Sequence, residues 1–440
     1  MGPVSRANLA FWLLWLAALF WCGRNSFDDP SSIFYDQAAA YTQRYSALRG
    51  LEIDAFLAND TRVAAARPPD HHDEILCVGV PSINRTSEGF LARTVGGLVD
   101  GLTPAERASL HVVVLLADKT PAAHFAYGQP WLTAVVDEVL VYEQAGKDHS
   151  ALPGYRTIPF EIRPDGRRRG DGRVENMRLD HSVLVETCRA RGAPYFAFVE
   201  DDIVTSPDWY RKFLEGVARL ELRTKRAPDR DWVYLRLFYS EIFMGWNAEE
   251  WATYAEVIFL VYAAFIVGFL VLRGRQRRRL AAAPSGYSPL MSKEEPAAAR
   301  SAQSQRHLQK FNHLSAMVIG LWLPAAIALV FLGGRITMRR LSPVPRPGIR
   351  EMPRYGCCAQ GLVIPKRHLP TFYSLLLDPP YDFPGDMMLE GHADQKNLAK
   401  WALEPSVMQH VGLKQSSEGT RLAEVWNFSF ERRTMATKNG

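Results

Sequence analysis

Cysteine is scarce in this sequence, with five residues among 440. That number is too small for a disulfide scaffold, and no CxxC pair or Cys/His spacing indicates a structural zinc site. A basic folded stretch with interleaved aromatic residues is also missing, which argues against nucleic-acid binding, and the net charge of +5 is modest. One cysteine, Cys22, lies in a long apolar run. The other four could form one or two disulfide bridges in an oxidising compartment, and the sequence leaves their pairing open: Cys77, Cys188, Cys357 and Cys358.

Long apolar runs, by contrast, are plentiful. Residues 9–22 form an unbroken apolar run between Arg6 and Arg24, so residues 1–23 are predicted to be an uncleaved signal-anchor helix, with a cleaved signal peptide as the alternative. Residues 254–272 and 314–332 are apolar over 19 residues each, close to the ~20 that a membrane-spanning helix needs. Buried core helices are the competing interpretation of these two runs.

The segment between the second and third runs, residues 273–313, is rich in arginine, alanine, proline and serine. This composition predicts a disordered loop, and its positive charge predicts a cytosolic location. Residues 24–253 and 333–440 are then luminal. Because the second luminal piece is short, the sequence predicts one luminal domain interrupted by a transmembrane hairpin.

Residues 195–203 (YFAFVEDDI) are the most informative stretch. The apolar run predicts a buried strand, and three carboxylates follow it at the end where α/β sheets bind ligands. Hard oxygen ligands there suit Mg²⁺ or Mn²⁺ bridging a diphosphate. A solvated acidic turn is the simpler alternative.

Further strands are predicted at residues 74–80 and 111–116, and a third β-prone run at 134–142. Helices are predicted at 90–98 and 176–189. Strands that alternate with helices, each strand ending in a polar loop, indicate a nucleotide-binding α/β domain.

Several short stretches together resemble two related groups of glycosyltransferases with the GT-A fold: residues 78–82 (VGVPS), 200–202 (EDD), 232–237 (WVYLRL), 357–361 (CCAQG) and 409–413 (QHVGL). One group is the type IV N-acetylglucosaminyltransferases that branch N-glycans. The other is the Golgi enzymes that add N-acetylgalactosamine (GalNAc) to glycosylphosphatidylinositol (GPI) anchors. The apolar hairpin is the feature of the second group. The resemblance covers most of residues 74–250 and 350–430.

The resemblance implies a Rossmann-like GT-A domain in the Golgi lumen that transfers GalNAc from UDP-GalNAc to the first mannose of the GPI core. The acceptor would be a GPI lipid or a GPI-anchored protein. A non-catalytic glycan-binding membrane protein and an N-glycan enzyme are alternatives, and a transporter fits three spans poorly.

The resemblance also implies roles for individual residues. Glu200, Asp202 and His410 would hold Mn²⁺ or Mg²⁺, with Glu200 and Asp201 also contacting ribose, water or sugar; a lone histidine is otherwise often structural. The other candidates for donor binding are Pro81, Asn84, Arg85, Asp118, Arg178 and Asp180, the last two being equally explained as a helix-start pair.

Transfer with inversion needs a general base for the acceptor hydroxyl. Asp386 is the first candidate, Glu390 lies four residues further on the same predicted helix face, and Glu241 is the second choice. Three glycosylation sequons begin at Asn59, Asn84 and Asn427. Asn84 is predicted to be unmodified because it lies in residues 81–85, the loop after the first strand that would bind the donor. The aromatic residues Trp246, Trp251 and Tyr254 could form an interfacial belt or stack on a sugar.

Overall fold

The computed structural model describes residues 2–66, 73–84, 89–143, 152–160, 162–163, 166–281, 297–342, 348–352, 359–412 and 425–433. The chain forms two compact units. One comprises residues 1–40 and 244–343, and the other comprises residues 41–243 and 344–440.

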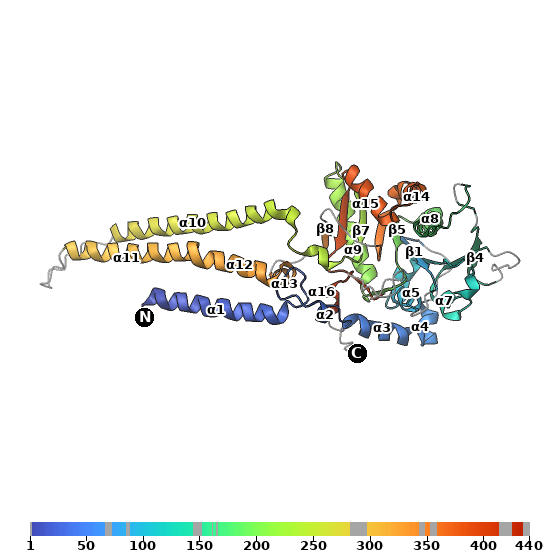
Figure 1. Ribbon diagram of the computed structural model, residues 1–440, viewed down its shortest axis with the longest axis horizontal. Coiled ribbons are helices and arrows are strands. Elements are labelled where there is room, and N and C mark those ends of the chain that lie inside the picture. Colours follow the sequence, from blue (N-terminus) through green and yellow to red (C-terminus); the bar gives the residue numbers. More distant parts are fainter. Residues whose placement is uncertain are drawn as a thin grey trace. The chain divides into compact units, whose positions relative to one another are not determined.

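The second unit is built on a sheet whose described strands number nine, in the order β4-β3-β2-β1-β5-β9-β7-β10-β8. Strands β4, β1, β5, β7 and β8 of this sheet are labelled in Figure 1. Seven of the nine strands run in one direction, while β9 and the edge strand β8 run in the other. Their bounds are β1 Leu76–Ser82, β2 Leu110–Leu116, β3 Glu138–Tyr142, β4 Tyr155–Ile158, β5 Tyr195–Phe198, β7 Trp232–Arg236, β8 Ile349–Glu351, β9 Leu362–Pro365 and β10 Ala399–Leu403.

A short antiparallel ribbon lies apart from this sheet. It pairs β6 (Ile203–Thr205) with β11 (Met408–His410). Because β6 begins directly after the acidic stretch, this ribbon brings a late segment of the chain beside residues 200–202. Strands from both sides of the apolar hairpin thus belong to one compact unit.

Buried apolar strands form the core of this unit. Every residue of β2 is buried, and β1 is buried except at Pro81, as expected for parallel strands covered on both faces. Around them pack the helices α3 (Tyr45–Leu57), α4 (Asp60–Ala65), α5 (Leu91–Val99), α6 (Pro104–Ala108), α7 (Pro130–Val135), α8 (Arg173–Arg191), α9 (Trp209–Arg226), α14 (Leu369–Leu377), α15 (Gly385–Gln395) and α16 (Phe428–Glu431).

The pairing of the cysteines is resolved in part. A disulfide joins Cys77 in β1 to Cys188 in α8, while Cys22 is a free, buried thiol. Cys357 and Cys358 lie outside the described residues.

Most of the predicted elements are confirmed. The strands at 74–80, 111–116 and 195–199 correspond to β1, β2 and β5, and the helices at 90–98 and 176–189 to α5 and α8. The β-prone run at 134–142 is a strand only in its second half, because α7 continues to Val135. The result is a mixed α/β architecture with a large, mainly parallel sheet, compatible with a GT-A-like fold.

Among its described residues, the first unit contains three helices that are long and apolar enough to cross a membrane. They are α1 (Pro3–Asn25), α10 (Trp251–Ala281), and a third that continues from α11 (Ala297–Met317) through a π-helical turn at Val318–Trp322 into α12 (Leu323–Gly333). Two shorter helices, α2 (Gln37–Ala40) and α13 (Arg335–Leu341), belong to the same unit.

The predicted disorder of residues 273–313 is wrong for much of the segment. Helix α10 continues to Ala281, and α11 begins at Ala297. Alanine, arginine and glutamine are strong helix formers, so the polar flanks extend the apolar helices by several turns. The remainder of this segment lies outside the described residues.

Two of the three aromatic residues of the predicted belt pack within the first unit. Trp246 donates from Nε1 to the carbonyl oxygen of Phe331 at 3.2 Å, and the Tyr254 hydroxyl lies 3.0 Å from the Arg335 guanidinium. Trp251 remains 69% exposed. The exposed side chain of Trp251 is therefore accessible to a membrane interface or a sugar.

Candidate functional site

The acidic stretch lies beyond the carboxyl end of β5. This strand ends at Phe198, and Glu200, Asp201 and Asp202 follow in a turn before β6. The carbonyl oxygen of Asp202 accepts a hydrogen bond from the Val411 amide at 2.9 Å, which continues the β6–β11 pairing by one step. The turn is therefore fixed against the segment that carries His410.

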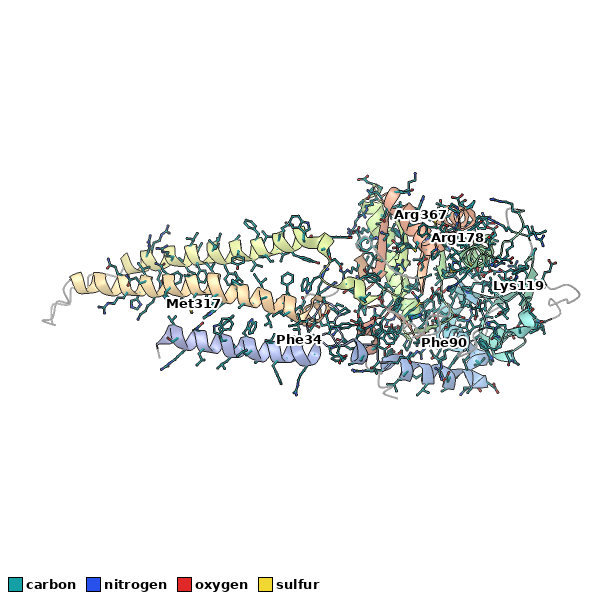
Figure 2. The ribbon with its side chains drawn as sticks, in the orientation of Figure 1. Phe34, Phe90, Lys119, Arg178, Met317 and Arg367 are labelled. Atoms are coloured by element: carbon teal, nitrogen blue, oxygen red, sulfur yellow. A yellow bond between two sulfur atoms is a disulfide. The ribbon has the colours of Figure 1, made fainter. Side chains whose placement is uncertain are left out.

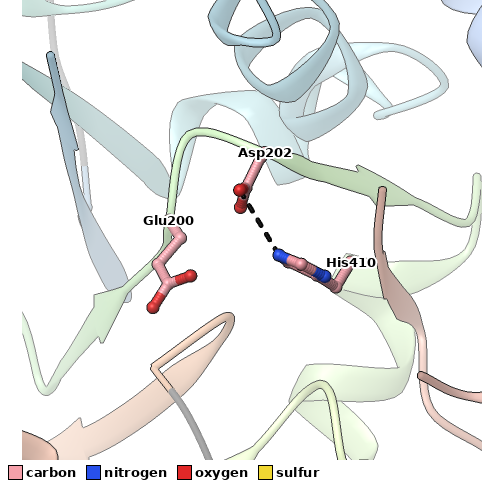
Figure 3. Close-up of side chains that lie close together, drawn as sticks. All are labelled: Glu200, Asp202 and His410. Carbon is pink, nitrogen blue, oxygen red and sulfur yellow. Dashed lines mark ion pairs between the residues drawn. The ribbon is translucent and has the colours of Figure 1, made fainter. Parts of the chain in front are cut away.

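Glu200, Asp202 and His410 converge in one cluster (Figure 3). One potential ligand atom from each lies within 4.8 Å of the others, and His410 Nε2 is 3.3 Å from Asp202 Oδ2. Asp202 and His410 are buried, and Glu200 is partly buried. The three predicted metal ligands, 210 residues apart at their extremes, are thus brought to one place.

The surroundings of this cluster suit a small divalent cation. A Cβ atom at Gly412 would lie 2.5 Å from Asp202 Oδ2 and 3.3 Å from His410 Nε2, so only glycine leaves the space beside both groups. Gln360 donates to Glu200 Oε2 at 2.9 Å and orients that carboxylate. Two carboxylates and an imidazole form a donor set that Mn²⁺ accepts readily.

The electrostatics of the cluster favour the protonated form of Glu200. Burial, followed by the negative charge of Asp202, raises the pKa of Glu200 from 4.5 to about 8. The neighbouring carboxylates Asp386 and Asp201 raise it further, and His410 opposes the shift. A bound divalent cation would reverse this balance by favouring the ionised carboxylate.

Asp201, the middle residue of the turn, is hydrogen-bonded to the end of β1. Its Oδ2 accepts a hydrogen bond from the Ser82 hydroxyl at 2.6 Å, and its side chain is buried. The structure therefore places this predicted donor-binding residue against the end of β1.

Of the three candidate bases, Asp386 acts electrostatically on the cluster. It lies in the first turn of α15, and its charge contributes to the raised pKa of Glu200. Burial raises the pKa of Asp386 itself, while the positive charge of Arg236 acts in the opposite direction. A carboxylate in this setting is poised to accept a proton.

Glu390 and Glu241 have other partners. Glu390 accepts hydrogen bonds from the Tyr234 hydroxyl and the Arg236 guanidinium and pairs with Lys400 at 3.0 Å. Glu241 accepts from the backbone amide and hydroxyl of Ser429. Glu390 thereby binds α15 to the sheet, and Glu241 holds the C-terminal segment around α16.

Three predicted donor-binding residues gather at the carboxyl ends of β1, β2 and β3. The backbone amide of Asn84 donates to Asp118 Oδ2 at 3.0 Å. Asp180 accepts from Arg169 at 2.6 Å and from the Tyr142 hydroxyl. Burial raises the pKa of Asp180 to about 6, against the effect of Arg169 and with a contribution from Asp118.

The remaining donor candidates lie differently. Pro81 is part of β1 itself, and Arg85 falls outside the described residues. Arg178, labelled in Figure 2, is fully buried and donates hydrogen bonds to four backbone carbonyls at the end of α14, those of Leu375, Leu376, Asp378 and Pro380. Its guanidinium ties α8 to α14.

Several residues of the site were not among the sequence candidates. Gln360 and Gly412 belong to the stretches 357–361 and 409–413 that carry the resemblance, and membership of these stretches is the sequence signal for them. Ser82 closes the stretch 78–82 in the same way. Tyr142 and Arg169 carry no comparable signal, because only the fold brings them to Asp180.

Comparison with known proteins gives one informative relative. The chain is 26% identical over 167 residues to the mouse protein alpha-1,3-mannosyl-glycoprotein 4-beta-N-acetylglucosaminyltransferase B, and this region is 36% of the chain. The chain spans only 27% of the length of that relative. No protein-family model matches the chain. The similarity supports a distant relationship to hexosamine-transferring glycosyltransferases.

Proposed function

We propose that this chain is a metal-dependent glycosyltransferase that moves a hexosamine from a nucleotide-diphosphate sugar to a glycan hydroxyl. The observation that carries this proposal is the convergence of Glu200, Asp202 and His410 beyond the carboxyl end of β5. Similarity to an N-acetylglucosaminyltransferase supports it independently.

Glu200, Asp202 and His410 would hold the cation, with Gln360 orienting the Glu200 carboxylate. A divalent cation at this place supplies positive charge that stabilises the departing diphosphate. Because the pKa of Glu200 is about 8, this carboxyl must give up a proton before it can serve as a ligand. Asn84 and Asp118 then offer hydrogen-bonding groups for the nucleoside at the ends of β1 and β2.

Asp386 is the proposed general base. Its position in the first turn of α15 is fixed because Glu390, one turn later, is bound by Tyr234, Arg236 and Lys400. Its raised pKa makes it a better acceptor for the proton of the attacking hydroxyl. Transfer by direct displacement would invert the anomeric centre.

The proposed substrates are UDP-GalNAc and the first mannose of the GPI core, with the Golgi membrane as the location. The resemblance of the motifs supports this choice, and so does the chain order. Helices long enough to span a membrane interrupt the sequence between β7 and β8 of one sheet. Tethering the catalytic unit to the bilayer by two further spans would raise the effective concentration of a lipid-linked acceptor.

Transfer of N-acetylglucosamine to an N-glycan is the second candidate function. The name of the mouse relative favours it. That activity gives no role to the two apolar helices inserted in the catalytic unit, and we therefore place it second.

The test is a turnover assay on the full chain purified in detergent. UDP-GalNAc and UDP-GlcNAc are each offered with a GPI-glycan acceptor and with an N-glycan acceptor, in Mn²⁺. We expect GalNAc transfer to the GPI glycan, and Asp386→Asn is expected to lower kcat by at least about 100-fold while donor affinity is kept. Preference for UDP-GlcNAc and the N-glycan would establish the second candidate. A folded protein that turns over neither donor would contradict both and indicate a glycan-binding role.

A further inference from the structure

A buried chain of hydrogen bonds leads to the middle residue of the acidic turn. His124 Nε2 lies 3.1 Å from the Ser82 hydroxyl, and this hydroxyl lies 2.6 Å from Asp201 Oδ2. At the other end, His124 Nδ1 accepts a hydrogen bond from the Ala126 amide at 3.1 Å. His124 and Ser82 are each 2% exposed and Asp201 is 6% exposed.

The donor and acceptor in each of these hydrogen bonds follow from the position of the proton on His124. Since Nδ1 of His124 accepts from a backbone amide, the proton of the neutral ring resides on Nε2 and is donated to the Ser82 oxygen. Ser82 then donates its own proton to Asp201. Burial lowers the pKa of His124 to about 4, which keeps the ring neutral at physiological pH.

The trio is not a nucleophilic triad. In a Ser-His-Asp triad the carboxylate orients the histidine, and the histidine removes the proton of the serine. Here the carboxylate bonds to the serine, the histidine donates to it, and all three groups are buried. What the arrangement does provide is a fixed anchor for Asp201.

The backbone of the turn is held at further points. The Thr94 hydroxyl donates to the carbonyl oxygen of Asp201 at 2.7 Å and accepts from the Ile203 amide at 3.2 Å. On the other flank, the Val411 amide bonds to the carbonyl oxygen of Asp202. The middle side chain of the turn, that of Asp201, is thus bound to β1, while Glu200 and Asp202 cluster with His410.

We infer that Ser82 and His124 are positioning residues, which hold Asp201 so that Glu200 and Asp202 converge with His410 and bind a divalent cation tightly. Asp201 contacts neither the cation nor the donor. This inference rests on the cation site of the proposed function, but it concerns binding and can be tested without any transferase assay.

The experiment measures Mn²⁺ affinity of the full-length protein in detergent, together with the electron paramagnetic resonance spectrum of the bound ion. Groups that orient metal ligands typically contribute roughly 10- to 100-fold to affinity, so we expect Ser82→Ala and His124→Leu to weaken binding by that factor and to change the spectrum. His124→Gln keeps an N–H donor near the position of Nε2 and is expected to recover most of the affinity.

A matched control separates positioning from general destabilisation. Ser109 also has a hydrogen-bonded hydroxyl, shared with Tyr210, but it precedes β2 at the opposite end of the sheet. Ser109→Ala is expected to leave the Mn²⁺ affinity and the spectrum unchanged. This result is expected even if the Ser109→Ala and Ser82→Ala variants have the same thermal stability.

Substitution of Asp201 gives the sharpest discrimination. Asp201→Asn keeps an oxygen that accepts from Ser82, and we expect its Mn²⁺ affinity to stay within a few-fold of wild type, whereas Asp201→Ala should resemble Ser82→Ala. A loss in Asp201→Asn as large as in Asp201→Ala would overturn the inference, as would wild-type affinity in Ser82→Ala or a wild-type protein that binds no Mn²⁺. Weakened binding in Ser82→Ala beside a wild type without turnover would sustain the inference and contradict the proposed function.

Discussion

In the proposed metal site, the protonation state of Glu200 governs cation binding. Its pKa is about 8 in the folded chain, against an ordinary value of 4.5. Between these values the folded state holds a proton that the unfolded state has released. In the absence of a cation, the contribution of this group to stability is therefore present at low pH and is lost as the pH rises toward 8.

Cation binding should show the opposite dependence on pH. Because the ion displaces a proton from Glu200, Mn²⁺ affinity is expected to rise by about tenfold per pH unit below pH 8 and to level off above it. Calorimetric titrations from pH 6 to 9, in buffers of different ionisation enthalpy, would also detect the released proton. An affinity that stays constant between pH 6 and 8 would contradict the assignment of Glu200 as a ligand.

The space beside Asp202 depends on one glycine. A Cβ atom in Gly412→Ala would meet Asp202 Oδ2 at 2.5 Å and displace the carboxylate. We expect Mn²⁺ affinity to fall at least about 10-fold while the protein stays folded. The control is Gly391→Ala on α15, where a Cβ meets nothing within 4 Å, and there we expect up to ~1 kcal/mol of stabilisation with unchanged affinity. Equal affinities in both variants would show that the cation lies elsewhere.

At the scale of single elements, the contact between α8 and α14 gives Arg178 a structural role. Arg178 is buried and donates to backbone carbonyls at the end of α14. In Arg178→Leu those carbonyls lose their partner, and the free energy of unfolding is expected to drop by roughly 2–4 kcal/mol, as measured by chemical denaturation. Donor affinity of the folded fraction should not change.

The same helix provides a control for this prediction. Arg189 is exposed and pairs with Glu186, three residues earlier, among the described contacts, so Arg189→Leu should leave the free energy of unfolding close to that of the wild type. Loss of donor affinity in Arg178→Leu without loss of stability would restore Arg178 to the donor site.

Local sequence patterns predict the elements that have strong periodicity or long apolar runs. The run that became β5 and the acids after it could be placed from residues 195–203 alone, because an apolar strand followed by polar residues is a local signal. Strands β8 and β11 are three residues long, too short for any period to be detected. The helical flanks within residues 273–313 combine a composition typical of disordered loops with residues of high helix propensity, so composition alone does not predict them.

Long-range pairing limits what the sequence can predict about the site. The motif resemblance pointed to His410, but its distance from Asp202 follows only from the register of β6 and β11. The roles of Asp201 and Arg178 depend on hydrogen bonds to Ser82 and to the end of α14. No spacing in the sequence contains that information, because the partners are more than 100 residues away.

At the scale of the whole molecule, the chain leaves the α/β unit after β7, enters helices long enough to span a membrane and returns as β8. Strand β9 then lies between β5 and β7, so the sheet needs both segments. The prediction that this unit is luminal can be checked through its sequons.

Asn59 is the sequon most open to modification. It is exposed and caps α4, whereas Asn427 is 2% exposed and hydrogen-bonded, and the Asn84 amide donates to the carbonyl oxygen of Ala123. In protein expressed in mammalian cells, we expect a glycosidase-sensitive gel shift that Asn59→Gln abolishes and Asn427→Gln does not. An unglycosylated Asn59 would contradict the luminal placement.

The proposed hexosamine transfer depends on a metal site formed by Glu200, Asp202 and His410. The most direct measurement is the rate of hexosamine transfer from the UDP-sugar to a glycan acceptor by the purified full chain, in Mn²⁺ and in EDTA, for wild type and Asp202→Asn. We predict a rate that EDTA abolishes and Mn²⁺ restores in the wild type, and at least about a 100-fold lower rate in the variant at every Mn²⁺ concentration. Transfer that persists in EDTA, or an Asp202→Asn variant as active as the wild type, would contradict the account.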